Sequence, residues 1–181
     1  MVDAPAPIGA RNRCHNNDGG LRMGSVVNIA DVTLSDHGHG EAFAARHGAI
    51  GPLIGARQLG CRFVVVPPGK KGWPYHAHHA NEEMFVILEG AGTLRLGGVG
   101  HPIKAGDVIA CPAGGPETAH QIVNTGEAEL RYLAISTMRS PELVEYPDSG
   151  KFQVVSSAPG AGQRMRYIGR AETSLDYWDG E

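Results

Sequence analysis

The sequence predicts an all-β domain, an antiparallel barrel or sandwich, and three observations support this prediction. The chain of 181 residues contains 26 Gly and 12 Pro, and glycine weakens helices while it serves the tight turns between strands. Between residues 58 and 138, short apolar runs follow one another and are separated by Gly, Pro or Asn. The apolar fraction of 41% is sufficient to form a core. These observations exclude a helical bundle and a disordered chain.

Seven short segments of this central region are expected to form strands, and their regular spacing is typical of an antiparallel barrel or sandwich. The glycine-rich segments 89–92 and 97–100 are expected to form hairpin turns between them. The expected strands are Leu59–Val66, Glu83–Leu88, Gly92–Leu96, His101–Ile103, Val108–Cys111, His120–Val123 and Leu130–Thr137.

The N-terminal segment, residues 1–57, has a less regular pattern. We expect a strand over Val26–Leu34 and a Gly/His-rich turn at Asp36–Gly40. Glu41–His47 is expected to form two turns of helix, with Gly48 as the residue that ends it.

The C-terminal segment, residues 139–181, is interpreted as looser chain. Its last residues include Tyr177 and Trp178, so we expect this end to pack on the barrel. No repeat or linker divides the sequence. We therefore expect one structural domain, which consists of an N-terminal extension with a strand and a short helix (1–57), a barrel (58–138) and a C-terminal extension that packs on the barrel (139–181).

Charge and hydropathy exclude two classes of partner. The formal net charge is -3 at pH 7 and no cluster of Lys and Arg is present, so the chain has no basic surface for a nucleic acid. The longest apolar run, Phe63–Val66, is far shorter than the ~20 residues that span a bilayer. We therefore expect neither a nucleic acid nor a membrane as a partner.

The cysteines and the N-terminal sequence favour a cytoplasmic protein. Cys14, Cys61 and Cys111 do not have the spacing of a disulfide framework, and residues 1–13 lack the apolar core of a signal peptide. Cys61 and Cys111 lie in strand-like apolar segments, so we interpret them as buried packing residues rather than nucleophiles.

Three histidines and one glutamate form a candidate metal site. His76 and His78 lie two residues apart, so in an extended chain their imidazoles point to the same face. Glu83 shares a strand face with two large apolar side chains, and a buried carboxylate is costly unless it is paired or binds a cation. His120 begins another expected strand. Together these side chains are suitable ligands for a divalent transition metal.

Other polar residues are weaker candidates. His79 points away from its neighbours and is expected to be a surface or rim residue. His37 and His39 have metal-like spacing but no accompanying carboxylate, so we expect them in a loop. Arg95, Lys104 and Arg131 are weak candidates for binding an anionic substrate, because charged side chains on strands usually face water. The weak candidates for a catalytic base or for a donor to a phosphate group are Tyr75, His79 and Arg95.

Two spaced motifs in this region resemble those of the cupin family, and together they are far more specific than either motif alone. The first motif is G-x5-H-x-H-x3–4-E-x6-G, and its matching residues are His76, His78, Glu83 and Gly90. The first glycine of the motif, Gly69, lies one position further from His76 than in the family pattern. The second motif is G-x5-P-x-G-x2-H-x3-N, and its matching residues are Gly106, Pro112, Gly114, His120 and Asn124. The loop before the histidine is longer here than in the family pattern. The resemblance covers residues 57–138.

The resemblance implies a double-stranded β-helix, a jelly-roll-like barrel, in which His76, His78, Glu83 and His120 hold a divalent metal. Imidazole ligands do not select among Zn, Mn, Fe and Ni. Similar proteins are often described as sugar-phosphate-isomerase-like, which implies a metal-dependent enzyme acting on a small polar substrate such as a sugar phosphate. Two alternatives stay open: a dioxygenase that uses Fe or Mn, and a non-catalytic module that binds a metal or small ligand. Cupins commonly pair through their sheets, so we expect a homodimer.

Overall fold

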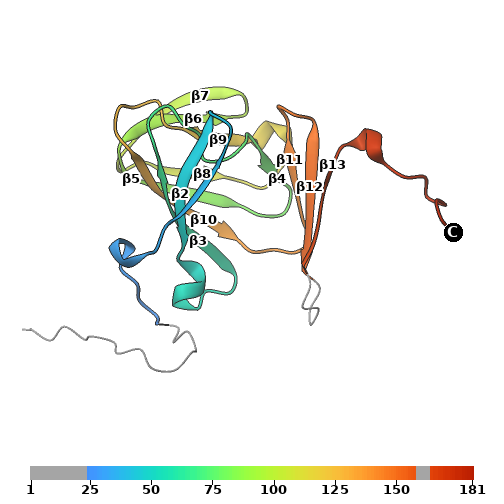
Figure 1. The fold of residues 1–181 in the computed structure, drawn as a ribbon, viewed down its shortest axis with the longest axis horizontal. Coiled ribbons are helices and arrows are strands. Elements are labelled where there is room, and N and C mark those ends of the chain that lie inside the picture. The colour runs from blue at the N-terminus through green and yellow to red at the C-terminus, as the bar shows by residue number, and fades with distance from the viewer. Residues whose placement is uncertain (1–23, 158–163) are drawn as a thin grey trace, which may run out of the picture.

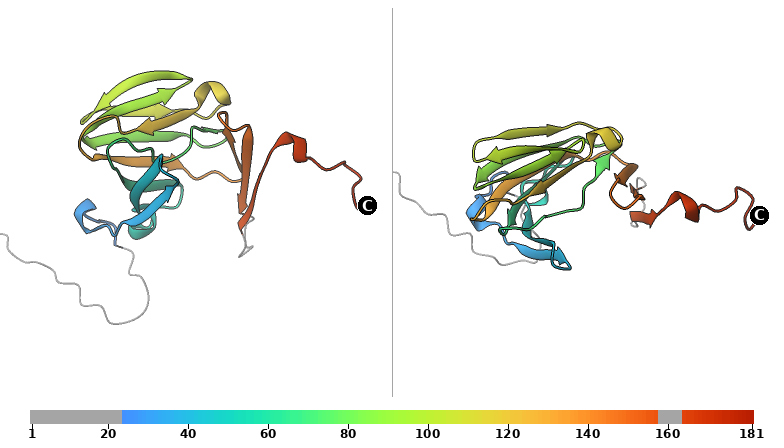
Figure 2. Two further views of the ribbon diagram at one scale, coloured as in Figure 1. Left: turned by 45° about the horizontal axis from the view of Figure 1, so that its top comes forward. Right: turned by 90° about the horizontal axis from the view of Figure 1, so that it is seen from above.

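The computed structural model describes residues 24–157 and 164–181, and within them the chain is all-β, as predicted. These residues form thirteen strands and four short 3-10 helices, arranged in three sheets (Figure 1). Two sheets face each other as a barrel, and the third stands beside it (Figure 2). The 3-10 helices are η1 (Ile29–Asp31), η2 (Gly51–Ile54), η3 (Pro116–Thr118) and η4 (Ala171–Thr173).

All strand pairings are antiparallel, in sheets of six, three and four strands. The six-stranded sheet runs, in spatial order, through β1 (Ser35–His39), β2 (Phe43–Ala49), β3 (Leu59–Val66), β10 (Leu130–Thr137), β5 (Glu83–Glu89) and β8 (Val108–Cys111). The three-stranded sheet contains β7 (Val99–Lys104), β6 (Ala91–Leu96) and β9 (His120–Val123). The four-stranded sheet contains β13 (Arg164–Gly169), β12 (Lys151–Ser157), β11 (Glu142–Tyr146) and β4 (Ala77–His78). The seven strands predicted for the central region are all present.

Apolar side chains from both facing sheets fill the barrel. Val64, Phe85 and Tyr132 come from the six-stranded sheet, and Leu94 and Ile122 come from the three-stranded sheet. All five belong to one buried cluster. Burial of a large apolar side chain contributes about 1.5–3 kcal/mol, so this cluster holds together the strands that carry the candidate metal ligands.

The outer face of β3 is covered as well. Phe63 and Val65 point to this face and pack against Val32 and Ile50 of the N-terminal segment. A strand that is buried on both faces has a continuous apolar run instead of an alternating pattern. The covering segment therefore explains the run Phe63–Val66 in the sequence.

The predicted helix over Glu41–His47 is wrong, because this part of the chain forms β2. This strand pairs with β1 on one side and with β3 on the other. Ala45 enters the barrel core, and Gly48 lies so close to Val32 that a Cβ atom would not fit between them. Pairing on two sides and burial outweigh the helix propensity of the alanines in this segment.

Two further predictions for the N-terminal segment are also wrong. The segment Asp36–Gly40 is not a turn: most of it belongs to strand β1, and the turn begins at Gly40. Val26–Leu34 is not a strand: it is irregular chain around η1, in which Asn28 caps the 3-10 helix through its side chain. Four of its apolar residues, Val27, Ile29, Val32 and Leu34, pack on the outer face of the barrel, while Val26 is exposed.

Most of the C-terminal extension is more regular than predicted, since β11, β12 and β13 form a meander that joins β4. Beyond η4 the expectation of packing is wrong. Leu175, Tyr177 and Trp178 are 76%, 84% and 71% exposed, and the chain end extends away from the body (Figure 1). Tyr177 and Trp178 contact each other edge to face, with 4.8 Å between their ring centroids, and do not pack on the barrel.

Cys61 and Cys111 are packing residues, as predicted, while Cys14 lies outside the described residues. Cys111 is 1% exposed in the barrel core, and burial raises the pKa of its thiol to about 12. Cys61 packs at the outer apolar cluster, and burial raises its pKa as well. Raised pKa values make both thiols poor nucleophiles. Separately, no helix in the described residues is long and apolar enough to cross a membrane.

Gly90, in the turn between β5 and β6, is expected to be essential for stability. Its φ of +82° is a left-handed conformation, and a Cβ atom there would overlap the carbonyl oxygen of Glu129. Gly90→Ala should therefore lower the free energy of unfolding by at least about 2 kcal/mol, because strain and overlap add. Gly98→Ala is the matched control, since Gly98 has a similar φ of +85° with nothing within 4 Å. Equal losses for the two variants in urea unfolding would contradict the overlap.

Candidate metal centre

The backbone brings His76 and His120 side by side at one end of the barrel. His76 donates its N–H to the carbonyl of His120 at 3.1 Å, and His120 donates to the carbonyl of His76 at 2.8 Å. His78 lies two residues further on, in β4, and Glu83 begins β5 opposite Cys111. All four side chains are at least half-buried, and His120 is only 3% exposed.

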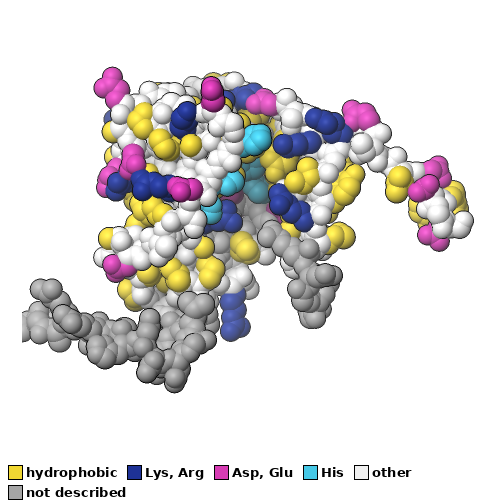
Figure 3. Space-filling model, in the orientation of Figure 1, with side chains coloured by type: hydrophobic (Ala, Val, Ile, Leu, Met, Phe, Trp, Pro, Cys, Tyr) yellow, Lys and Arg dark blue, Asp and Glu magenta, His cyan; other side chains and the backbone are white. Residues whose placement is uncertain are grey.

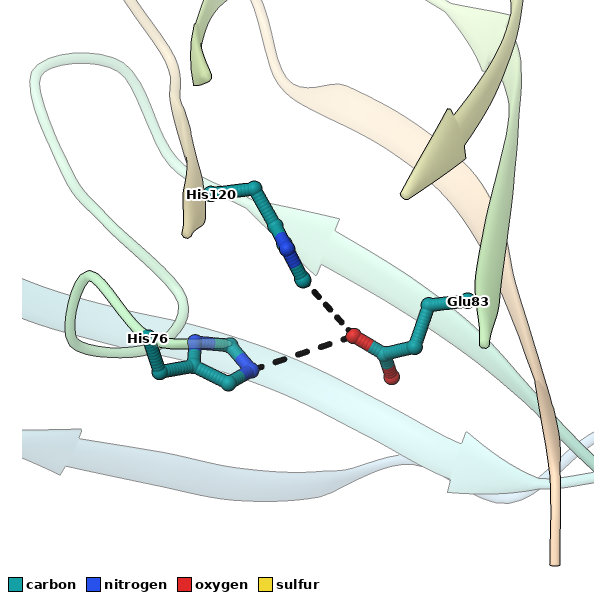
Figure 4. A group of neighbouring side chains, drawn as sticks. All are labelled: His76, Glu83 and His120. Carbon is teal, nitrogen blue, oxygen red and sulfur yellow. Dashed lines mark hydrogen bonds and ion pairs between the residues drawn. The ribbon is translucent and has the colours of Figure 1, made fainter. Parts of the chain in front are cut away.

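The four side chains converge on one oxygen atom, Oε2 of Glu83. The Nε2 atoms of His120, His78 and His76 lie 2.8, 3.5 and 3.8 Å from it. His76, Glu83 and His120 each offer a ligand atom within 4.8 Å of the other two (Figure 4). His78 does not belong to this group of three, although its Nε2 atom lies close to Glu83. The structure thus brings all four predicted residues to one centre, three of them most closely.

The second nitrogen of each histidine faces an oxygen atom. Nδ1 of His76 lies 2.7 Å from the carbonyl of Pro74, and Nδ1 of His120 lies 3.4 Å from the carbonyl of Thr118. A neutral imidazole that donates from Nδ1 carries its lone pair on Nε2, the nitrogen that faces Glu83. Donation from Nδ1 to a carbonyl leaves the Nε2 lone pair free to ligate a metal. This donor set fits a divalent transition metal.

The protonation states of His76 and Glu83 also suit metal binding. Burial lowers the pKa of His76 to about 4, so the imidazole is neutral near pH 7. Burial acts to raise the pKa of Glu83, but its hydrogen bonds with His120 and His78 outweigh this effect and hold the pKa well below the usual range. A neutral imidazole and an ionised carboxylate are the forms that bind a metal.

A second carboxylate, from the C-terminal extension, lies behind His78. Oε2 of Glu142 is 3.8 Å from Nδ1 of His78. The other carboxylate oxygen accepts the backbone N–H groups of His79 and Ala80 at 3.1 Å each, and the side-chain amide of Asn81 donates to Oε2. Burial lowers the pKa of His78, but contacts with Glu83 and Glu142 outweigh it and raise the pKa overall. Glu142 is thus held in place beside a candidate ligand.

Sequence reasoning missed Glu142, although the sequence holds a weak signal for it. Glu142 shares a strand face with the buried Val144 and the half-buried Tyr146. Glu145 shares the opposite face with Leu143, so alternation alone cannot say which carboxylate points inward. In the structure Glu145 instead pairs with His79 at 3.0 Å, and both side chains are partly exposed. His79 is therefore at the rim, as predicted.

Two of the three weaker candidates for an anion site, Arg95 and Arg131, pair with carboxylates elsewhere. Arg95 makes two hydrogen bonds to Asp148, at 2.7 and 2.9 Å, and stacks on the ring of Tyr75. Arg131 pairs with Glu129 at 3.0 Å, and Lys104 is exposed. His37 lies in strand β1 rather than in a loop, and it stacks on Trp73.

The fold and the candidate site place this protein among the small antiparallel β-barrels that have a cluster of histidines and a carboxylate at one end. Residues 62–136 match the model of the cupin domain family. Residues 62–136 therefore form a cupin domain, as the two motifs predicted. The matched region contains all four candidate ligands, whereas Glu142 lies beyond it.

Three known proteins illustrate the relationship. A sugar phosphate isomerase from a cupin superfamily, of Silicibacter pomeroyi, superposes with a TM-score of 0.70 at 23% identity, over 85% of this chain and 98% of that chain. At this identity the likeness shows the fold alone. A Thermotoga maritima structure named as a predicted oxalate decarboxylase superposes with a TM-score of 0.54 at 26% identity, over 63% of this chain and 99% of that one.

The third protein is a relative found by sequence, the oxalate-binding protein of Thermotoga maritima. It is 39% identical over 70 residues, which cover 39% of this chain and 54% of the relative. The chain thus spans about half the length of the first curated relatives that it matches.

Proposed function

We propose that His76, His78, Glu83 and His120 bind a divalent transition metal, and that the protein is a metal-dependent enzyme acting on a small polar substrate. The observation that carries this proposal is the convergence of three Nε2 atoms within 3.8 Å of one carboxylate oxygen. A bound metal would supply a Lewis acid that polarises a carbonyl oxygen of the substrate. Sugar-phosphate isomerisation is the reaction to test first, and Fe or Mn in the same site would permit a dioxygenase instead.

The protein residues of the centre have separate tasks in this proposal. Glu83 and the three imidazoles hold the cation. Phe85, whose ring centroid lies 5.6 Å from that of His120, keeps the barrel side of the centre apolar. Tyr146 stacks on His76, with 6.1 Å between the ring centroids, and covers it from the side of the C-terminal sheet.

A second candidate function is the non-catalytic binding of a small dicarboxylate. It is favoured by the relative named as an oxalate-binding protein, whose 39% identity is the highest among the three proteins compared above. Both candidate functions require the metal centre. They differ in turnover, which oxalate binding does not need.

Metal analysis followed by activity measurement tests these proposals. The purified protein should contain or take up about one equivalent of Zn, Mn, Fe or Ni per chain. Each metal-loaded form is then incubated with sugar phosphates, and isomer formation and oxygen consumption are measured. Isomer formation supports the first proposal, oxygen uptake supports a dioxygenase, and oxalate binding without turnover supports the second candidate. A folded protein that takes up none of the four metals would refute both functions.

Assembly as a cytoplasmic homodimer stays a prediction. Light scattering at micromolar concentration would distinguish a dimer from the 19.1 kDa monomer.

A further inference from the structure

One face of the C-terminal sheet is turned toward the metal centre. Side chains of directly paired residues on antiparallel strands share a face. Tyr146 pairs with Lys151, and Glu142 pairs with Val155, which in turn pairs with Arg166. All five residues therefore lie on the face of Glu142, the residue beside His78. Lys151 and Arg166 are two cations on this face.

Contacts connect both cations to the candidate ligand His76. Nζ of Lys151 lies 4.9 Å from the ring centroid of Tyr146, which stacks on His76. The Tyr146 hydroxyl donates to Oε1 of Gln153 at 3.4 Å, and Arg166 donates to the same oxygen from Nε and a terminal nitrogen at 3.3 and 3.1 Å. Lys151 and Arg166 are thus placed around one tyrosine at the edge of the centre.

Neither cation is neutralised by a carboxylate. Within the part of the chain that the structure describes, no Asp or Glu oxygen lies within 4.0 Å of Lys151 or Arg166, whereas Arg46, Arg95 and Arg131 each have such a partner. Figure 3 shows histidines in a hollow beside the barrel, with Lys or Arg side chains next to them on the side of the C-terminal sheet. Unpaired cations beside a metal centre are suited to bind an anionic group.

We infer that Lys151 and Arg166 form an anion subsite, which binds the phosphate or carboxylate group of a substrate whose other end lies at the metal centre. The inference rests on the proposed function and narrows its substrate class to anionic compounds. Arg166 supplies a planar donor pair for two oxygen atoms, and Lys151 supplies a point charge. Tyr146 and Gln153 hold the two cations in place.

Equilibrium binding to the zinc-loaded protein tests the subsite. Fructose 6-phosphate and fructose are titrated calorimetrically, with inorganic phosphate and oxalate as further probes. The wild type should bind the sugar phosphate more tightly than the neutral sugar. Arg166→Gln and Lys151→Gln should each weaken binding of the charged probe about tenfold, as expected for loss of a charged hydrogen-bond donor. Their zinc content should equal that of the wild type. Comparison of phosphate with oxalate tells which anionic group the subsite prefers.

Two exposed cations elsewhere on the molecule provide matched controls. Lys104→Gln and Arg57→Gln make the same changes in charge, at exposed positions on β7 and before β3, and should leave binding unchanged. If these controls weaken binding as much as the test variants do, the effect is one of net charge and the subsite is refuted. It is refuted as well if the zinc-loaded wild type shows no preference for any anionic probe. Because zinc content is measured separately, both results leave the metal centre itself in place.

Discussion

Glu83→Ala is expected to lower the metal affinity of the protein by more than about 100-fold. Loss of a residue that only orients a metal ligand lowers affinity by up to about 100-fold, and loss of a ligand itself should have a larger effect. The Oε2 atom of Glu83 lies 2.8 to 3.8 Å from all three Nε2 atoms. Its removal leaves three imidazoles without an anionic ligand. A metal at 100 times its dissociation constant stabilises the native state by about 2.7 kcal/mol, and the variant should lose most of this stabilisation. Metal analysis and thermal unfolding with and without added zinc measure both effects.

Glu82→Ala provides the control for this experiment. Glu82 is the exposed neighbour of Glu83, and only its backbone makes hydrogen bonds: its N–H donates to the hydroxyl of Thr137, and its carbonyl accepts from the N–H of Thr137. The control should retain the metal content of the wild type. An unchanged metal content in Glu83→Ala would refute the assignment of Glu83 as a ligand.

Glu142→Gln is expected to weaken metal binding by about 10- to 100-fold, the usual effect of removing a carboxylate that orients a ligating histidine. The substitution retains the shape of the side chain but removes the negative charge 3.8 Å from Nδ1 of His78. Without this charge, His78 has no anionic partner on the side away from the metal. Competition with a chelator, carried out on protein that circular dichroism shows to be folded, measures the loss.

Two further variants separate the effect of the carboxylate from a general loss of structure. Glu145→Gln changes a carboxylate on the same strand that pairs with the rim residue His79, and it should retain metal affinity. Asn81→Ala removes a hydrogen bond to Glu142 but leaves the charge in place. If Asn81→Ala loses as much metal affinity as Glu142→Gln, the role of Glu142 is to support the loop, and the orienting role is wrong.

The candidate site therefore extends beyond the cupin domain that carries its ligands. Residues 62–136 include His76, His78, Glu83 and His120, while Glu142 and the two unpaired cations lie on the C-terminal sheet. Strand β11 joins this sheet to the barrel by pairing with β4, where Val144 lies opposite His78. One short pairing thus places the additional residues next to the metal centre.

Much of the barrel could be predicted from the sequence because local pattern and tertiary environment agree there. Leu59–Val66, Val108–Cys111, His120–Val123 and Leu130–Thr137 have the predicted bounds, since turn residues end each apolar run. The N-terminal helix was wrongly predicted because helix propensity is weak compared with pairing on both sides of β2. The strands of the C-terminal sheet were missed because their half-exposed faces give only a weak alternating pattern.

The fold class and the four candidate ligands could be predicted from the sequence alone, because both follow from local spacing and pattern. Spacing of two residues puts His76 and His78 on one face, and the apolar neighbours of Glu83 turn it inward. Only the tertiary structure decided what surrounds these ligands. It selected Glu142 rather than Glu145, and it brought Lys151 and Arg166 beside Tyr146. The physical reason is that strand alternation is a local property, whereas the face that a strand presents to a distant site depends on its pairing partners.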